Sequence, residues 1–174
     1  KFLDLIYTNI ISSLKLNACR YGLICNENGF LLDDGVVARI DENTFLCHTT
    51  SGGEEKVYSW MEEWLQTEFY RFNVNLLNVT EQYSQITLSG PNSFKLLSEV
   101  TSKDFTKEKI PFMTFVSCKI FEYDCRIYRI SFTGDLSFEI SIPNSKALDV
   151  WKKLIKIGKK FDIIPFGTEA LHVM

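Results

Sequence analysis

The sequence predicts an α+β fold made of duplicated, mainly antiparallel β/α units. Hairpin-like strand segments alternate with amphipathic helical segments, and the order of three strands followed by a helix occurs twice. The turns expected near residues 41 and 134, and the helix starts expected at 51 and 144, are both offset by about 93 residues. Hydrophobic residues make up 45% of the chain and charged residues 24%, a composition that buries a core and excludes disorder.

In the first half of the chain, turn residues separate segments rich in β-forming side chains, and a longer helix follows them. We expect a short helix from Phe2 to about Ile10 and a second helix that opens at Ser51. The second helix carries apolar residues at a spacing of 3.6, namely Val57, Trp60, Met61, Trp64 and Leu65. The expected strands are 18–25, 31–40, 44–49, 74–79 and 84–89.

The second half repeats this order after a short helix that begins at Pro91, a residue suited to the first helical position. Strands are expected at about 114–121, 124–132 and 136–142. Asn144 then caps a helix whose apolar face consists of Ala147, Trp151, Leu154, Gly158 and Phe161. We therefore expect two subdomains, roughly 1–100 and 101–174.

Composition narrows the classes of function. Nineteen basic against 22 acidic residues give a net charge of −3, which does not support a nucleic-acid partner, and no apolar stretch predicts a membrane span. Five cysteines without a CxxC pair predict free thiols in a reducing, cytoplasmic environment, and only two histidines argue against a metal site. The chain lacks a Gly-rich phosphate loop, and because it stops within an expected helix we predict a piece of a longer protein.

Two adjacent carboxylates, Asp33 and Asp34, lie in the expected strand 31–40. Side chains alternate between the faces of a strand. Asp34 therefore shares a face with Leu32, Val36, Ala38 and Ile40. Because this apolar face is expected to be the core side, we predict that Asp34 points inward and that Asp33 is a surface residue. The pattern leaves open whether Asp34 serves a functional site or accepts hydrogen bonds from backbone amides in the hairpin.

A third carboxylate, Glu139, alternates with Phe138 and Ile140 in the expected strand 136–142. Periodicity alone favours a solvent-facing position, although the same geometry suits the polar wall of a cleft. For the aromatic residues Tyr21 and Phe132, core packing is the simpler interpretation.

Several separated motifs resemble the folate-binding domain of the glycine-cleavage aminomethyltransferase family. They are Tyr21-Gly22, Leu32-Asp33-Asp34, Glu55-Lys56, Leu88-Ser89-Gly90-Pro91 and Phe132-Thr133-Gly134-Asp135 with Phe138-Glu139-Ile140. Within that family, Cys19-Arg20-Tyr21-Gly22 and Gly167-Thr168-Glu169-Ala170-Leu171 resemble one branch, the C-terminal region of sarcosine oxidase alpha subunits. The resemblance spans essentially the whole chain and implies two interlocked β/α subdomains.

The resemblance also implies a tetrahydrofolate site. Asp34 matches the family's catalytic carboxylate beside the reactive folate nitrogens, and Glu139 matches the carboxylate that holds the pterin edge. Tyr21 matches an aromatic residue near the folate, and Phe132 stands where the family often has Tyr. Thr50 stands where the aminomethyltransferases usually carry an Asn in the site.

Function and partners are implied in the same way. The resemblance implies capture of the one-carbon unit of oxidised sarcosine on tetrahydrofolate, which gives 5,10-methylenetetrahydrofolate and glycine. Flavin and NAD are expected only elsewhere in the complete enzyme, and the implied partners are flavin-bearing and small subunits. The alternatives are another folate-dependent one-carbon enzyme, such as a dimethylglycine dehydrogenase or a free aminomethyltransferase, and a non-catalytic assembly scaffold with the same fold.

Overall fold

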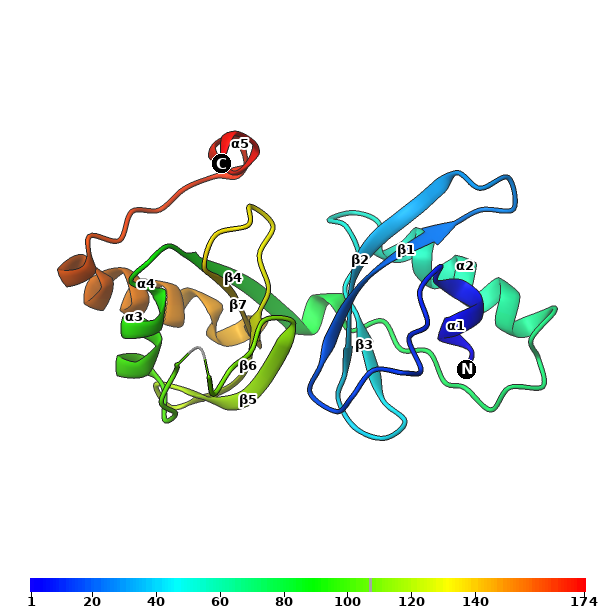
Figure 1. Ribbon diagram of the computed structural model, residues 1–174, viewed down its shortest axis with the longest axis horizontal. Helices are drawn as coiled ribbons and strands as arrows, with labels where there is room; N and C mark the ends of the chain where they lie inside the picture. The colour runs from blue at the N-terminus through cyan, green and yellow to red at the C-terminus, as the bar shows by residue number, and fades with distance from the viewer. Residues whose placement is uncertain (107) are drawn as a thin grey trace. The chain divides into compact units, whose positions relative to one another are not determined.

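Antiparallel strand pairing builds both sheets of the protein, as the computed structural model shows for residues 1–106 and 108–174 (Figure 1). The chain divides into unit 1, Lys1–Thr80, and unit 2, Glu81–Met174, and each unit combines one sheet with helices. The predicted α+β fold class is confirmed.

Unit 1 contains a three-stranded sheet in the order β1-β2-β3. Its elements are α1 (Leu3–Ile6), β1 (Cys19–Cys25), β2 (Leu31–Arg39), β3 (Phe45–Cys47) and α2 (Glu54–Gln66). The strands β1, β2 and β3 occupy the predicted segments. The first helix is shorter than the predicted range 2–10. The second helix was expected to open at Ser51, and α2 begins three residues later, directly after Gly53.

One face of this sheet packs against the helices. Ile24 of β1 and Val37 of β2 belong to the same buried cluster as Val57 and Met61 of α2. Gly35 of β2 lies so close to the residue that follows β3 that a Cβ atom there would be 1.9 Å from the backbone oxygen of His48. Only glycine fits this position without a backbone shift, since no flexible side chain could move away.

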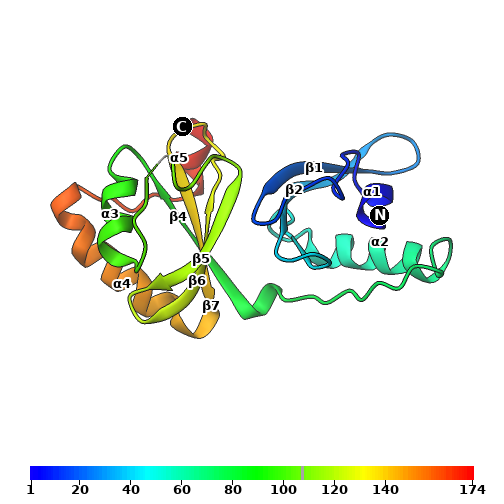
Figure 2. The same ribbon diagram turned by 60° about the horizontal axis from the view of Figure 1, so that its bottom comes forward.

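Unit 2 contains a four-stranded sheet in the order β4-β7-β6-β5. Its elements are β4 (Tyr83–Ser89), α3 (Ser93–Val100), β5 (Thr114–Ile120), β6 (Tyr123–Arg129), β7 (Ser137–Pro143), α4 (Ala147–Gly158) and α5 (Thr168–Val173). The helices α3 and α4 lie on the same face of this sheet (Figures 1 and 2). Phe138, Ile140 and Ile142 of β7 are fully buried against them.

The predicted repeat of elements is present. The order β1, β2, β3, α2 recurs as β5, β6, β7, α4, and the helices begin at Glu54 and Ala147, an offset of 93 residues. Unit 2 places β4 and α3 ahead of this repeat. The division between the units falls between residues 80 and 81, whereas the boundary was expected near 100. Strand β4 belongs to unit 2 because it pairs along its whole length with β7.

The predicted strand at 74–79 is wrong. The segment has no strand assignment, although its side chains alternate in exposure and Val74 and Leu76 pack on the core of unit 1. Alternation reports which side chains are buried. A strand also needs a neighbouring strand with which to exchange backbone hydrogen bonds, and sequence periodicity does not report that.

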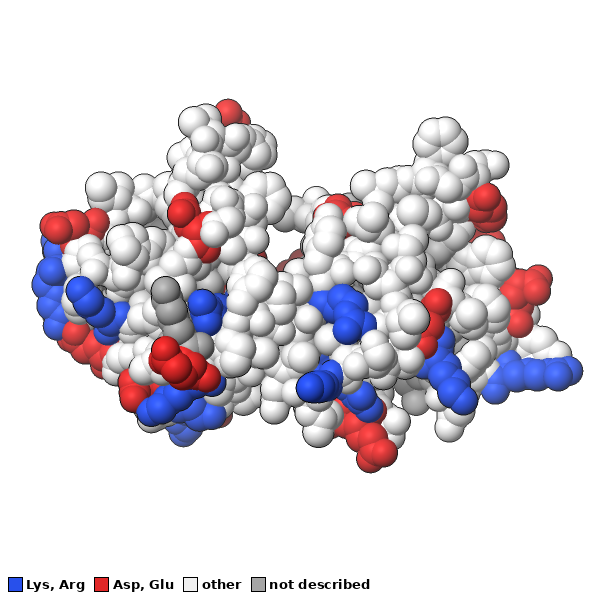
Figure 3. Space-filling model, viewed as in Figure 1, with Lys and Arg blue, Asp and Glu red and all other residues white. Residues whose placement is uncertain are grey.

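On the face of the molecule drawn in Figure 3, basic and acidic side chains are interspersed, as a net charge of −3 leads one to expect. Within residues 1–106 and 108–174, no helix has the length and apolar character that crossing a membrane requires.

Candidate functional site

Asp34 and Tyr21 form a hydrogen-bonded pair on the face of the unit 1 sheet opposite to α2. In the β1–β2 register, Tyr21 opposes Val36 and Leu23 opposes Asp34, so all four side chains share this face. The Tyr21 hydroxyl donates to Oδ2 of Asp34 at 2.6 Å, and the hydrogen bond raises the pKa of Tyr21 above its usual value. Tyr21 is 51% exposed and Asp34 is half-buried, so the carboxylate is both held in place and accessible.

The predicted orientation of the two aspartates is wrong, because Asp33 is the buried one, with 6% of its surface exposed. It opposes the buried Ile24 in β1 and shares the core face with Val37. The apolar residues at 32, 36 and 38 suggested that the opposite face of the strand was the core side. On the face of Asp33, however, Gly22 and Gly35 have no side chains, so other segments of unit 1 can pack closely against this face of the sheet. The core side therefore follows from this packing rather than from the count of apolar residues.

Thr50 supplies the partners that make a buried Asp33 tolerable. Its hydroxyl donates to Oδ1 of Asp33 at 2.5 Å, and its backbone N–H lies 3.3 Å from Oδ2. Gly53 completes this arrangement, since a Cβ atom there would lie 2.7 Å from the Thr50 hydroxyl and 3.0 Å from both carboxylate oxygens. Asp33 thus ties β2 to the loop before α2, a role that sequence reasoning missed and that the Asp-Asp pair together with a glycine-containing loop could have indicated.

Glu139 lies on β7 in unit 2, between Thr87 of β4 and Tyr128 of β6. It occupies the face opposite to Phe138 and Ile140, as the alternation predicts, but this face is not open. The side chain is half-buried, and burial raises the pKa of its carboxyl group. Among residues 1–106 and 108–174, no hydrogen bond or ion pair engages this carboxylate.

Phe132 follows β6, which ends at Arg129, and its ring is 76% exposed. Core packing is therefore the wrong interpretation for both Phe132 and Tyr21. His48 lies half-buried with Nδ1 at 3.0 Å from the backbone oxygen of Val36. The structure brings Tyr21 and Asp34 into contact, and it brings Thr50 into contact with Asp33 rather than Asp34.

In the described parts of the chain, no group of three or more His, Cys, Asp or Glu residues is arranged to hold a metal ion.

The whole chain, residues 1–174, matches the family model of the GCVT N-terminal domain, and the protein belongs to this family. Sarcosine oxidase subunit alpha from Corynebacterium sp. (strain P-1) is 42% identical over 176 residues. That alignment covers 100% of this chain and 18% of the relative, so the chain spans less than a fifth of that relative's length.

Two solved structures share the fold. The glycine cleavage system aminomethyltransferase T from Bartonella henselae superposes with a TM-score of 0.71 at 23% identity, covering 88% of this chain and 39% of that one. A chain of heterotetrameric sarcosine oxidase from Corynebacterium sp. U-96 gives a TM-score of 0.60 at 16% identity, covering 76% of this chain and 64% of that one. At these identities the likeness supports the fold alone.

The first testable prediction concerns Asp33. Replacing Asp33 with Asn removes the charge and puts an amide N–H₂ where one of the two acceptors stood, so a Thr50 donor loses its partner. We expect the free energy of unfolding to fall by about 1–3 kcal/mol, measured by urea denaturation. Asp124→Asn, at an exposed position of β6, is the matched control and should leave stability unchanged. Equal stability of the two variants would contradict the structural role of Asp33.

The second prediction follows from the raised pKa of Glu139. A carboxyl group that binds its proton more tightly in the folded state supports folding below its ordinary pKa of 4.5, and this support is lost as pH rises through the folded-state pKa. Glu139→Gln removes this dependence. The stability of the variant relative to the parent should therefore increase from pH about 4 to about 7. Glu81→Gln, at an exposed position, should show no such trend, and a flat difference for Glu139→Gln would refute the prediction.

Proposed function

We propose that this chain is a tetrahydrofolate-binding domain that serves one-carbon transfer. The observation that carries the proposal is the accessible Asp34 carboxylate held by the Tyr21 hydroxyl at 2.6 Å. A carboxylate that is held in one orientation and is accessible to a ligand can contact that ligand and accept a proton from it. Membership of the GCVT N-terminal domain family supports the same choice.

Tetrahydrofolate would supply nucleophilic nitrogens that accept a one-carbon unit. In this proposal Asp34 is the catalytic residue: it stabilises positive charge near those nitrogens and accepts a proton. Tyr21 keeps the carboxylate oriented through its hydrogen bond, and the charge of Asp34 helps to keep the Tyr21 hydroxyl protonated as a donor.

Glu139 fits a second role, in binding. Its carboxylate is half-buried and has no partner among the described residues, so both oxygens can accept hydrogen bonds. A pterin edge offers a ring N–H and an amino group in parallel, the arrangement that a carboxylate accepts best. Burial raises the pKa of Glu139 because it destabilises the charged carboxylate. Hydrogen bonds from such a ligand would offset this destabilisation.

The family resemblance leads us to propose Phe132 and Thr50 as further folate contacts. The exposed ring of Phe132 offers a face for stacking against an aromatic ligand. The Thr50 hydroxyl donates its hydrogen bond to Asp33, so towards the folate this hydroxyl can act only as an acceptor. Phe132 and Thr50 are therefore proposed to contribute less to affinity than Glu139.

The substrate and partners of the whole protein are proposed from its relatives. A relative named sarcosine oxidase subunit alpha and a fold neighbour described as heterotetrameric support a role within a multi-subunit oxidase. We propose that flavin-bearing and small subunits oxidise sarcosine, and that this chain passes the one-carbon unit to tetrahydrofolate with release of glycine. NAD and flavin would be held elsewhere in that assembly.

The third prediction tests Asp34 in the complete enzyme. Asp34→Asn keeps the shape of the side chain but removes its charge, so formation of 5,10-methylenetetrahydrofolate should fall roughly a hundredfold or more. Sarcosine oxidation should continue, with formaldehyde released instead. The control, Asp124→Asn, should transfer the one-carbon unit at the parent rate. Unchanged transfer in Asp34→Asn would exclude Asp34 as the catalytic group.

The fourth prediction tests Glu139 through binding rather than turnover. Glu139→Gln replaces a charged acceptor pair by one acceptor and one donor, a loss of roughly 1–3 kcal/mol. The dissociation constant for tetrahydrofolate should therefore rise roughly tenfold, measured by titration with tryptophan fluorescence. Glu81→Gln should bind like the parent. If the parent binds tetrahydrofolate and Glu139→Gln binds it equally well, Glu139 has no part in the site.

A further inference from the structure

Two cysteines face each other across the β5–β6 hairpin. Cys118 of β5 and Cys125 of β6 are directly opposite in the antiparallel register, so their side chains point to the same face. Both are free thiols, and their sulfur atoms lie 3.7 Å apart. The folate proposal uses neither residue.

The geometry of this pair permits a disulfide without moving the strands. Opposed residues of an antiparallel pair have Cα atoms roughly 4.5–5.5 Å apart. Disulfides span Cα separations of about 4.4–6.8 Å. Only the sulfur atoms must approach further, to about 2.05 Å, and rotation of the two side chains can bring this about.

The surroundings make the two thiols unequal. Cys118 is half-buried, whereas Cys125 is 6% exposed and belongs to the core of unit 2. The hydrogen bond with Cys125 and the charge of Lys103 lower the pKa of Cys118. The pKa of Cys125 is raised by the same hydrogen bond and by burial. Cys118 is therefore the accessible sulfur that more readily forms a thiolate.

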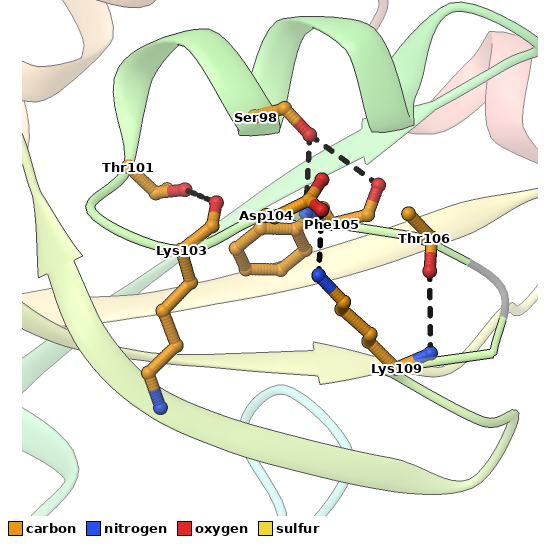
Figure 4. A network of polar contacts seen from close by, with 7 residues as sticks. All are labelled: Ser98, Thr101, Lys103, Asp104, Phe105, Thr106 and Lys109. Carbon is orange, nitrogen blue, oxygen red and sulfur yellow. Dashed lines mark hydrogen bonds and ion pairs between the residues drawn. The ribbon is translucent and has the colours of Figure 1, made fainter.

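The loop after α3 holds Lys103 near this pair. The backbone N–H of Ser102 donates to the backbone oxygen of Lys119 at 3.2 Å, one residue from Cys118. Figure 4 shows the Thr101 hydroxyl donating to the Lys103 carbonyl oxygen, at 3.0 Å. The Ser98 hydroxyl, on α3, donates to the backbone oxygen of Phe105 in this loop and accepts from the backbone N–H of the same residue. These hydrogen bonds hold the backbone from which the Lys103 side chain extends.

We propose that Cys118 and Cys125 are a reversible redox site, in which hydrogen peroxide oxidises Cys118 and Cys125 then closes a cross-strand disulfide. In the first step the Cys118 thiolate attacks one peroxide oxygen, an S–O bond forms and the O–O bond breaks. The departing hydroxide takes up a proton and leaves as water. Cys118 is then a sulfenic acid.

In the second step the sulfur of Cys125 attacks the sulfur of Cys118. An S–S bond forms, the S–O bond breaks, and the departing hydroxide leaves as water with the proton that Cys125 gives up. In total the two thiols lose two electrons and two protons, and the hydrogen peroxide that accepts them is reduced to two waters. A low-molecular-weight thiol reverses the change.

Cys47 provides an internal contrast. It is half-buried beside Tyr7, and desolvation raises its pKa to about 11. Its thiol therefore stays protonated near neutral pH and should react slowly with peroxide.

The purified protein is treated with hydrogen peroxide, alkylated and digested with trypsin. Cleavage after Lys109, Lys119 and Arg126 releases peptides 110–119 and 120–126, each with one cysteine. We expect a species in which these two peptides are joined by a disulfide, a loss of two titratable thiols, and full recovery of both after treatment with dithiothreitol.

Matched variants separate the roles of the two thiols. Cys125→Ser should abolish the joined species and leave Cys118 as a sulfenic acid that dimedone traps, whereas Cys47→Ser should form the joined species as the parent does. The proposal is overturned if the parent, with excess peroxide, keeps both thiols free or pairs Cys118 with a different cysteine. Because the parent decides this, a variant that fails to fold does not affect the test.

Discussion

The register of the β1–β2 pair is the constraint on which unit 1 depends. Gly22 and Gly35 oppose each other, and each lies where a Cβ atom would strike a neighbour. For Gly22 the neighbour is the ring of Tyr7, and for Gly35 it is the backbone of His48, just after β3. This close packing fixes which face of the sheet is covered. A shift of one residue would exchange the two faces. Because the register cannot shift, Asp33 is held inside and Asp34 is held on the open face.

Three carboxylates in similar sequence settings therefore have three different environments. Asp33 is buried and satisfied by Thr50, so it joins β2 to the loop before α2. Asp34 is accessible and restrained by one hydroxyl. Glu139 is half-buried with a raised pKa and without a partner in the described chain. Burying a carboxylate without a hydrogen-bond partner costs free energy, and a bound ligand that donates hydrogen bonds can offset this cost. Glu139 therefore suits ligand binding better than a structural role.

Unit 2 places its two reactive features on adjoining strands. Glu139 lies on β7, whose fully buried neighbours Phe138 and Ile140 anchor it against α3 and α4. Strand β6 pairs with β7 on one side and carries Cys125 opposite Cys118 on the other. A rigid central strand gives a binding carboxylate a fixed position. The outer hairpin, with one core thiol and one half-buried thiol, can change its covalent state while the pairing of its strands is kept.

The sequence by itself determined the hairpins, the two longer helices, their repeat at an offset of 93 residues and the family, because these depend on local periodicity, turn residues and motif spacing. The family resemblance also singled out Asp34 and Glu139 as candidate folate residues. Only the tertiary structure decided that Asp33 is the buried aspartate, that residues 74–79 do not form a strand, and that the face of Glu139 is partly covered. Each of these outcomes depends on contacts between segments distant in the chain. Alternation along one strand distinguishes two faces but carries no information about what packs on either.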